Sequence, residues 1–276
     1  MTSVDWNGFK SYLGQHLATN YANDVLRYCL KYSDILLNNE PHRILLLSKD
    51  KQRLVMSSLT NLSKFLGIYQ QWKESMEDAG LKWSKSDSFK SFINIFNSNH
   101  SDLIDWYHKA IEVLNDNEKL YLRFMMLSGV RKNEGILSFN MIISLYKQNK
   151  LDEYWNQELS VLEHWKYPKL FLRNTKCLYI SIIPKELITE ISNSKPVSYP
   201  MIRKRLEKNS LRVRIKQLRS YWLSYMVKNK ILISEEADVC QGRVSKEVMV
   251  RHYLKESLKE LSDRILKGLE DLGKSI

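Results

Sequence analysis

The scarcity of helix-breaking residues is the feature that most constrains this chain. Its 276 residues include only nine glycines and five prolines, and most segments carry apolar residues at spacings of three and four. Such spacing places apolar side chains on one face of a helix, whereas strands favour strict alternation. The sequence therefore predicts a mainly α-helical fold with few strands.

The charge balance limits the choice of partners. Apolar residues make up 43% of the chain, which is enough for one or two substantial cores. Lysine and arginine total 43 against 31 acidic residues, a net charge of +12. An excess of this size attracts polyanions and favours nucleic acid as the partner, although a solvated basic surface is the alternative for charge alone.

The cysteines and the chain start favour an intracellular setting. Cys29, Cys177 and Cys240 are far apart and form no CxxC pair, so we expect neither a disulfide framework nor a zinc site, and a reducing cytosol fits best. The first residues lack a basic segment followed by an apolar one, and no apolar run approaches the roughly 20 residues needed to cross a bilayer. We therefore predict a soluble, cytoplasmic protein without a membrane partner.

Residues 1–82 are predicted to form a small helical domain. Apolar residues at helical spacing form two successive patterns: Trp6, Phe9, Leu13 and Leu17, then Leu26, Leu30 and Leu37. Between Gln52 and Trp72, one face is apolar: Leu54, Val55, Leu59, Leu62, Phe65 and Leu66. The polar side is basic: Lys49, Lys51, Arg53, Lys64 and Lys73. This face is a candidate DNA clamp, and a merely solubilising face is the alternative.

A short polar run, from Lys82 to Ser88, separates two regions of apolar periodicity. We place a linker at residues 83–98 and a second domain at residues 99–276. Helical patterns continue from about 88 to 115 and from Asn117 to Met126, ending near Gly129. Residues 170–184 are instead rich in β-branched and aromatic residues around a polar centre, which predicts a β-hairpin.

Four places in the second domain supply the groups that a metal-free phosphodiester cleavage needs. Such chemistry requires a nucleophile, cations that neutralise the phosphate oxygens, and a proton donor for the leaving oxygen. Arg131 follows Gly129 at a predicted helix start, where phosphate is favoured. Lys176 projects from the polar part of the hairpin. Taken singly, a helix cap and a surface lysine are the ordinary alternatives.

The other two places lie further along the chain. Lys216 and Arg219 share a helix face and follow a dense basic run that includes Arg212 and Arg214. Arg243 precedes Tyr253 by ten residues, and nearby cations ease the deprotonation of a tyrosine. A helix opening near Tyr199 also carries three candidate DNA-binding cations: Arg203, Lys204 and Arg205.

In this order, the four places resemble the tyrosine recombinase (integrase) family, and they are most similar to the integrases of archaeal viruses and plasmids. The family has a Gly-hydrophobic-Arg-x-x-Glu box, a hairpin lysine, a His-x-x-Arg box, a Gly-His/Trp position and a tyrosine about ten residues later. The matching positions here are Gly129 to Glu134, Lys176, Lys216 to Arg219, Gly242 with Arg243, and Tyr253. Lys216 replaces the usual histidine, and Arg243 replaces histidine or tryptophan.

The resemblance implies a mechanism. Tyr253 attacks the scissile phosphate and forms a 3′-phosphotyrosyl enzyme, with no cofactor and no metal. Arg131 and Arg219 hold the non-bridging oxygens, and Lys176 protonates the leaving oxygen. Lys216 and Arg243 assist the phosphate, and Glu134 orients Arg131. Because bond energy is conserved, the free 5′ hydroxyl can rejoin either strand without ATP.

The resemblance also implies partners. It predicts an N-terminal core-binding domain and a catalytic domain on double-stranded DNA, in a homo-oligomer of two to four protomers associated with the nucleoid, with no small-molecule substrate. Leu254, Leu258, Leu261, Ile265, Leu269 and Leu272 form one apolar face. In similar integrases the C-terminal segment passes to a neighbouring protomer, so we expect a contact in trans, with packing on the same subunit as the alternative.

Three other functions remain open on the sequence. A type IB topoisomerase-like enzyme shares the chemistry without exchanging strands between sites. A relative that has lost activity would bind DNA only, and the complete cation set together with Tyr253 disfavours it. An RNA-binding helical protein would explain the charge and aromatics but not the ordered boxes.

Overall fold

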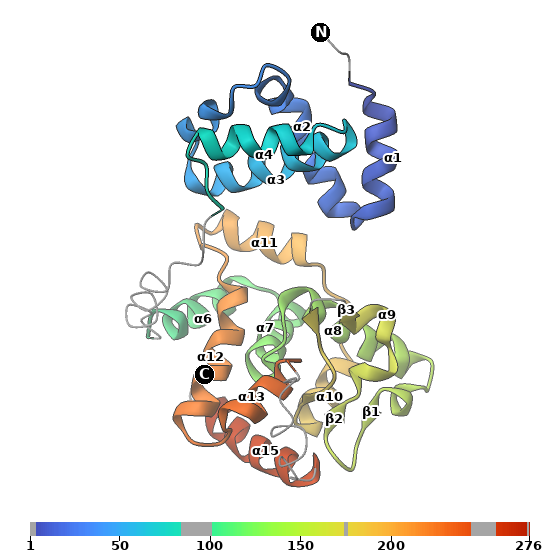
Figure 1. The fold of residues 1–276 in the computed structure, drawn as a ribbon. Coiled ribbons are helices and arrows are strands. Elements are labelled where there is room, and N and C mark those ends of the chain that lie inside the picture. Colours follow the sequence, from blue (N-terminus) through green and yellow to red (C-terminus); the bar gives the residue numbers. More distant parts are fainter. Residues whose placement is uncertain (1–3, 84–100, 174–175, 244–257, 275) are drawn as a thin grey trace. The chain divides into compact units, whose positions relative to one another are not determined.

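The computed structural model describes residues 4–83, 101–173, 176–243, 258–274 and 276 (Figure 1). The chain divides into two compact units, Met1–Asn97 and Ser98–Ile276, which are described here one at a time. Of the predicted linker, residues 83–98, only Trp83 belongs to the described residues.

The first unit is helical throughout its described part. Its elements are α1 (Trp6–His16), α2 (Thr19–Leu37), the 3-10 helix η1 (Pro41–Leu46), α3 (Lys49–Phe65) and α4 (Tyr69–Asp78). The Asp5 carboxylate caps α1 by accepting from the Gly8 N–H at 2.9 Å, which satisfies an otherwise unpaired donor of the first turn. Phe9, Leu59 and Trp72 lie in a shared core.

Two details of this unit differ from the predicted pattern. In α2 the buried face runs through Ala22, Val25, Cys29, Ile35 and Leu36, whereas the side chains of Leu30 and Leu37 are 57% and 41% exposed. The predicted inward position of Leu54 is also wrong, because that residue is 38% exposed. Smaller residues take the buried positions of α2, and the Cys29 thiol donates to the Ser58 carbonyl of α3 at 3.2 Å.

Most of the elements in the described part of the chain belong to the second unit. Its helices are α6 (Ser101–Val113), α7 (Asp116–Ser128), α8 (Lys132–Lys147), α9 (Pro168–Phe171), α10 (Lys185–Ser192), α11 (Tyr199–Lys208), α12 (Ile215–Lys228), α13 (Ser234–Cys240) and α15 (Leu258–Lys274), with 3-10 helices η2 (Leu151–Glu153) and η3 (His164–Lys166). Its strands are β1 (Trp155–Asn156), β2 (Val161–Leu162), β3 (Leu172–Arg173), β4 (Lys176–Cys177) and β5 (Ser181–Ile182).

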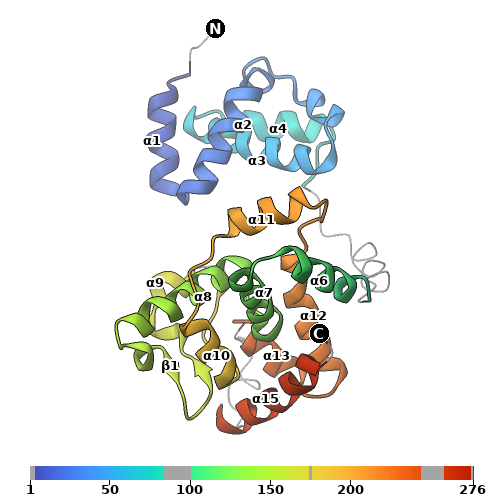
Figure 2. The same cartoon turned by 180° about the vertical axis from the view of Figure 1, so that it is seen from behind.

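Helix α7 is the centre of the second unit. It lies between α12 on one side and α8 and α10 on the other (Figures 1 and 2), and Tyr121, Phe124 and Met125 on it are fully buried. A capping box between Asn115 and Glu118 begins the helix, and Gly129 ends it in the left-handed conformation. The predicted helix end near Gly129 is confirmed.

The strands form two small antiparallel sheets. One has the order β1-β2-β5, and the other is the pair β3-β4. The predicted hairpin over residues 170–184 is therefore only partly right: its start belongs to α9, and Ser181–Ile182 pair with Val161–Leu162. Pro168 favours a helical first turn, and Ile182 and Ile183 are buried in the main core. The mainly helical class with a small antiparallel sheet is confirmed.

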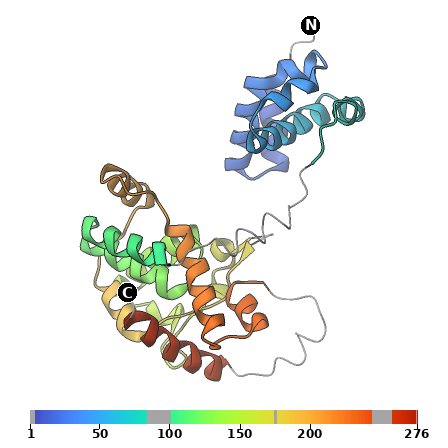
Figure 3. The same cartoon turned by 90° about the vertical axis from the view of Figure 1, so that its left-hand side faces the viewer.

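Helix α15 packs on its own chain. Its apolar face, formed by Leu261, Ile265, Leu269 and Leu272, is buried, and the helix contacts α7, α12 and β5. Figure 3 shows α15, in dark red, beside the orange α12. Arg264 further pairs with Glu236 of α13 at 2.8 Å. The described part of this stripe therefore packs on the same subunit, which was the alternative to the expected contact in trans, and the trans contact stays a prediction.

Within the described residues, no helix combines the length and apolar character that a membrane crossing needs.

Candidate phosphate-binding site

Cationic residues from three separate segments line one open pocket in the second unit. Its volume is about 410 Å³. The contributing segments are the start of α8, the β3-β4 hairpin and the first turns of α12. The lining residues are Arg131, Lys132, Asn133, Arg173, Lys176, Lys216 and Arg219. Six of these seven carry a positive charge, so the pocket suits an anion.

The turn between α7 and α8 delivers Arg131 to the pocket. Gly129 has φ +60°, and a Cβ there would lie 2.5 Å from the Trp222 ring. Only glycine tolerates both the conformation and the contact. The chain then turns so that Arg131 becomes the N-cap of α8, beside the free N–H groups of the first turn, a position that favours negative charge.

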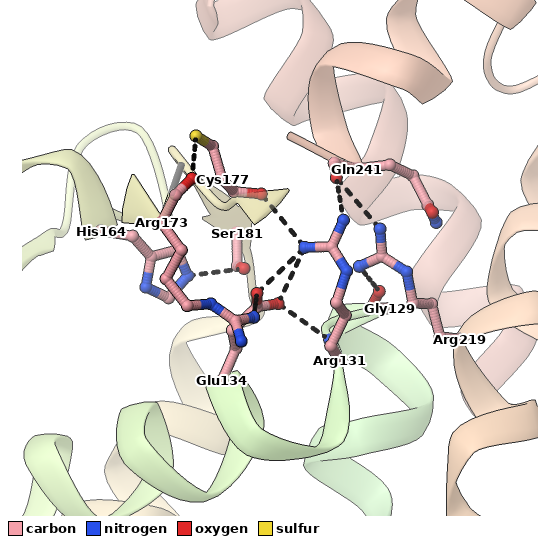
Figure 4. A network of polar contacts seen from close by, with 9 residues as sticks. All are labelled: Gly129, Arg131, Glu134, His164, Arg173, Cys177, Ser181, Arg219 and Gln241. Atoms are coloured by element: carbon pink, nitrogen blue, oxygen red, sulfur yellow. Dashed lines mark hydrogen bonds and ion pairs between the residues drawn. The ribbon is translucent and has the colours of Figure 1, made fainter. Parts of the chain in front are cut away.

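Glu134 holds the Arg131 side chain in place (Figure 4). The carboxylate accepts from Arg131 Nη1 at 3.0 and 3.3 Å and from the Arg131 backbone N–H at 3.2 Å. Glu134 is 1% exposed, whereas the Arg131 side chain is 22% exposed. A buried carboxylate of this kind is a rigid partner, so the predicted role for Glu134, orienting Arg131, fits this geometry.

Arg219 approaches the same point from α12. Its Nη1 donates to the Gly129 carbonyl and its Nη2 to the Gln241 carbonyl, each at 3.0 Å. Burial is the main cause that lowers the pKa of the Arg219 guanidinium to about 10, and the charge of Arg131 acts in the same direction. Two adjacent cations with this little solvent are an environment that a bound anion would stabilise.

The segment at Gln241 and Gly242 completes this corner. The Gln241 carbonyl also accepts from Arg131 Nη2 at 3.3 Å, and the Cys177 carbonyl on β4 accepts from Arg131 Nη1 at 3.1 Å. Gly242 has φ +72°, and a Cβ there would lie 1.8 Å from the Cys177 carbonyl oxygen. The glycine therefore lets two backbone segments meet beside Arg131.

Three pocket residues escaped the sequence reasoning. Arg173 donates to Glu134 Oε1 at 2.8 Å. Lys132 lies with its Nζ 3.8 Å from the centre of the Tyr199 ring, and burial, then the charges of Lys216 and Arg203, lower its pKa. Asn133 completes the wall. Their adjacency to Arg131 and Lys176 in the sequence was the available signal.

The other predicted catalytic residues have different places. Lys176 and Lys216 are exposed and line the pocket. Arg243 is exposed and is not among the residues that line the pocket. It pairs with Asp238 at 3.3 Å. Tyr253, the predicted nucleophile, lies outside the described residues.

The predicted DNA-binding cations divide into two groups. Three have protein partners. Arg203 pairs with Glu207 and Arg205 with the buried Glu118, both at 2.7 Å, while Arg214 donates to the Gln217 side chain and the Asp102 carbonyl. Arg205 therefore has a structural task in holding α11. Lys204 and Arg212 are exposed.

The basic face of the first unit contributes to a separate hollow. Lys49, Arg53 and Lys82 line an open pocket of about 260 Å³ together with Trp83, whose side chain is 52% exposed. Lys64 lies over the Tyr69 ring at 5.2 Å, and Lys73 pairs loosely with Glu77. Of the predicted basic face, Lys49 and Arg53 therefore lie together at this pocket.

A buried polar group lies behind the hairpin. His164 has no exposed surface; its Nδ1 is 2.6 Å from the Tyr154 hydroxyl and its Nε2 is 2.7 Å from the Ser181 hydroxyl. Burial lowers the pKa of His164 to about 3. The ring is neutral and structural. Among the described residues, no three His, Cys, Asp or Glu side chains gather as metal ligands would.

Comparison with known proteins adds no relative. No family model, no curated protein and no solved structure matches this chain.

Proposed function

We propose that this protein cleaves and rejoins double-stranded DNA through a covalent bond between Tyr253 and a 3′ phosphate, as a site-specific recombinase. One observation carries the proposal: Arg131 and Arg219, from different helices, converge on the Gln241 carbonyl at the edge of a pocket that Lys176 and Lys216 also line.

The chemistry of these groups fits a phosphodiester in its transition state. Two guanidinium groups offer planar sets of N–H donors to the non-bridging oxygens, where negative charge builds as the nucleophile attacks. Both are already fixed by Glu134 or by backbone carbonyls, so little reorganisation is needed when the phosphate arrives. Lys176 and Lys216 add charge at the rim.

The proposed step balances as follows. The phenolic proton of Tyr253 passes to solvent, its Oη forms a bond to phosphorus, and the bond from phosphorus to O5′ breaks. Lys176 gives a proton to O5′ and takes one back from water.

The length of chain between Tyr253 and the described residues limits where the nucleophile can lie. Tyr253 follows Arg243 by ten residues, so the distance between their Cα atoms is at most roughly 35 Å.

A suicide substrate tests the proposal. A duplex nicked beside the cleavage position loses its short fragment on cleavage, so the covalent complex accumulates and migrates slowly in a denaturing gel. We expect accumulation with the wild-type chain and none with Tyr253→Phe, while Tyr146→Phe, at an exposed position of α8, stays active. Trapping by Tyr253→Phe would falsify the assignment.

A second function has one observation in its favour. Strand exchange needs several protomers on DNA, and α15 is buried in cis, which suits an enzyme acting alone, as a type IB topoisomerase-like protein does. A recombinase joins two different duplexes into recombinant products. A relaxing enzyme removes supercoils from a plasmid at protein concentrations where no such products form.

A further inference from the structure

We infer that Arg173 is a positioning residue: through Glu134 it fixes the hairpin so that the Lys176 ammonium faces the phosphate pocket. This inference rests on the proposed function and assigns a task to a residue outside the family boxes.

The first argument is the register of the hairpin. Arg173 on β3 pairs directly with Lys176 on β4, and directly opposed residues of an antiparallel pair project from the same face. Two positive charges in this arrangement repel each other and destabilise the pair. Each strand has only two residues, so the hairpin has few bonds of its own with which to resist this repulsion.

The second argument is the partner that Arg173 finds. Its Nη2 donates to Glu134 Oε1 at 2.8 Å, and the same oxygen accepts from Arg131 Nη1 at 3.0 Å. Glu134 is 1% exposed, and the Arg173 side chain is 45% exposed. The buried carboxylate therefore offsets the charge of Arg173 and draws its side chain toward α8 (Figure 4). Lys176 stays in the pocket wall, and the charge of the arginine opposite it is offset by Glu134.

The third argument is that both strands of the hairpin are tied to the same point. The Glu134 carboxylate holds β3 through Arg173, and the Arg131 guanidinium holds β4 through the Cys177 carbonyl at 3.1 Å. Removing Arg173 releases β3 from Glu134 and leaves Arg131 as the arginine that pairs with this carboxylate. The hairpin can then rotate about the remaining tie, which moves Lys176 without changing its chemistry.

The alternative role for Arg173 is a direct grip on the phosphate. The two roles differ in the step they serve. A gripping cation stabilises charge on the non-bridging oxygens, whatever the leaving atom is. A residue that positions Lys176 serves only the transfer of a proton to the leaving O5′. A substrate in which sulfur replaces O5′ separates them, because a thiolate leaves readily without a proton.

The experiment measures single-turnover cleavage of two nicked duplexes, one ordinary and one with the bridging 5′ sulfur. We expect Arg173→Ala to lower the rate on ordinary DNA by about 10²-fold, the scale set by a misplaced catalytic group. On the sulfur substrate it should react at nearly the wild-type rate, as should Lys176→Ala. The double variant should be no slower than Lys176→Ala alone.

Two further variants serve as controls. Arg173→Lys retains one donor for Glu134 and should keep most of the rate on ordinary DNA. Arg123→Ala removes an arginine whose side chain is as exposed as that of Arg173, at 45%, but whose partner Glu190 is also exposed and lies away from the pocket, so it should react normally. If Arg173→Ala does not fold, as judged by its melting transition, Arg173→Gln, which keeps an N–H donor without the charge, takes its place.

Three results would overturn the inference. Equal losses on both substrates identify Arg173 as a phosphate contact. A normal cleavage rate of Arg173→Ala on ordinary DNA shows that Arg173 has no role in cleavage. An additive loss in the double variant shows that Arg173 acts independently of Lys176. All three leave the proposed function standing, whereas a wild-type chain that forms no covalent complex with either substrate refutes both proposals.

Discussion

Arg131 and Arg219 donate to a single acceptor, the Gln241 carbonyl oxygen, at 3.3 and 3.0 Å. One neutral carbonyl thus brings two cations together without neutralising either. Glu134 offsets the charge of Arg131 on its other side, and the Gly129 carbonyl holds Arg219. The two guanidinium groups are therefore preorganised before a ligand binds, which is the property that electrostatic catalysis requires.

The pair leads to a prediction for Arg219. Arg219→Ala should lower the single-turnover rate of covalent complex formation by about 10²- to 10³-fold, the usual cost of losing one charge-stabilising donor. Arg219→Lys should lose nearly as much, because one ammonium cannot span the Gly129 and Gln241 carbonyls as the guanidinium fork does. Normal turnover by Arg219→Lys would show that charge alone suffices.

Gly242 offers a test of the backbone approach beside Arg131. Gly242→Ala meets both a left-handed φ and the Cys177 carbonyl, whereas Gly80→Ala has the same φ of +72° with open space around it. Each should cost about 1 to 2 kcal/mol for the conformation. Gly242→Ala should cost more and abolish cleavage, as measured by urea unfolding and suicide-substrate trapping. Equal effects of the two variants would contradict this account.

Glu134 should contribute far more to stability than an exposed carboxylate with a similar partner. Glu134→Ala leaves Arg131 and Arg173 without their shared anion, and breaking a buried pair costs about 3 to 5 kcal/mol; because both arginines remain partly exposed, we expect the lower end. Glu190→Ala breaks the exposed pair with Arg123 and should cost at most about 1 kcal/mol. Chemical denaturation of both variants decides the comparison.

His164 predicts a loss of stability in acid. Burial lowers its pKa from 6.5 to about 3 in the folded chain, so between these values the unfolded state binds more protons than the folded state. The contribution of the neutral ring is fully present above pH 6.5 and is lost as the pH falls toward 3, by up to about 1.4 kcal/mol per pH unit.

Two matched variants, His164→Gln and His42→Gln, test this dependence of the free energy of unfolding on pH. His164→Gln should be less stable near neutral pH but should lose less of its remaining stability on acidification. His42→Gln replaces an exposed ring and should follow the wild-type curve. The free energy of unfolding, measured from pH 7 to pH 4, gives the answer, and parallel curves for all three proteins would refute the role of His164.

The packing of helix α15 on its own chain leads to a prediction for the free energy of unfolding and for the oligomeric state. Ile265 is 1% exposed, so Ile265→Ala should cost about 2 to 5 kcal/mol in the free energy of unfolding. It should leave the oligomeric state, measured by light scattering, unchanged. Glu270→Ala on the exposed side of the helix should change stability by no more than about 0.5 kcal/mol. A dimer that dissociates on Ile265→Ala would show that this helix contributes to a contact between protomers.

Local chemistry explains which elements were predictable from the sequence. Gly129 ends α7, Pro200 lies in the first turn of α11, and the apolar periodicity of α15 appears as a buried stripe. Each of these depends on neighbours within one or two turns. The short hairpin was harder, because the same β-branched run supplies β4 and then β5 in another sheet.

The sequence by itself determined the helical class, the basic character of the chain, and the candidacy of Arg131, Lys176, Lys216 and Arg219, because residue type and spacing are local properties. Only the tertiary structure decided that Arg131 and Arg219 share the Gln241 carbonyl, that Arg173 joins them through Glu134, and that Arg205 is committed to Glu118. It also decided that α15 packs in cis. These are relations between distant segments, set by packing and by the need to pair buried charge, and periodicity carries no information on them.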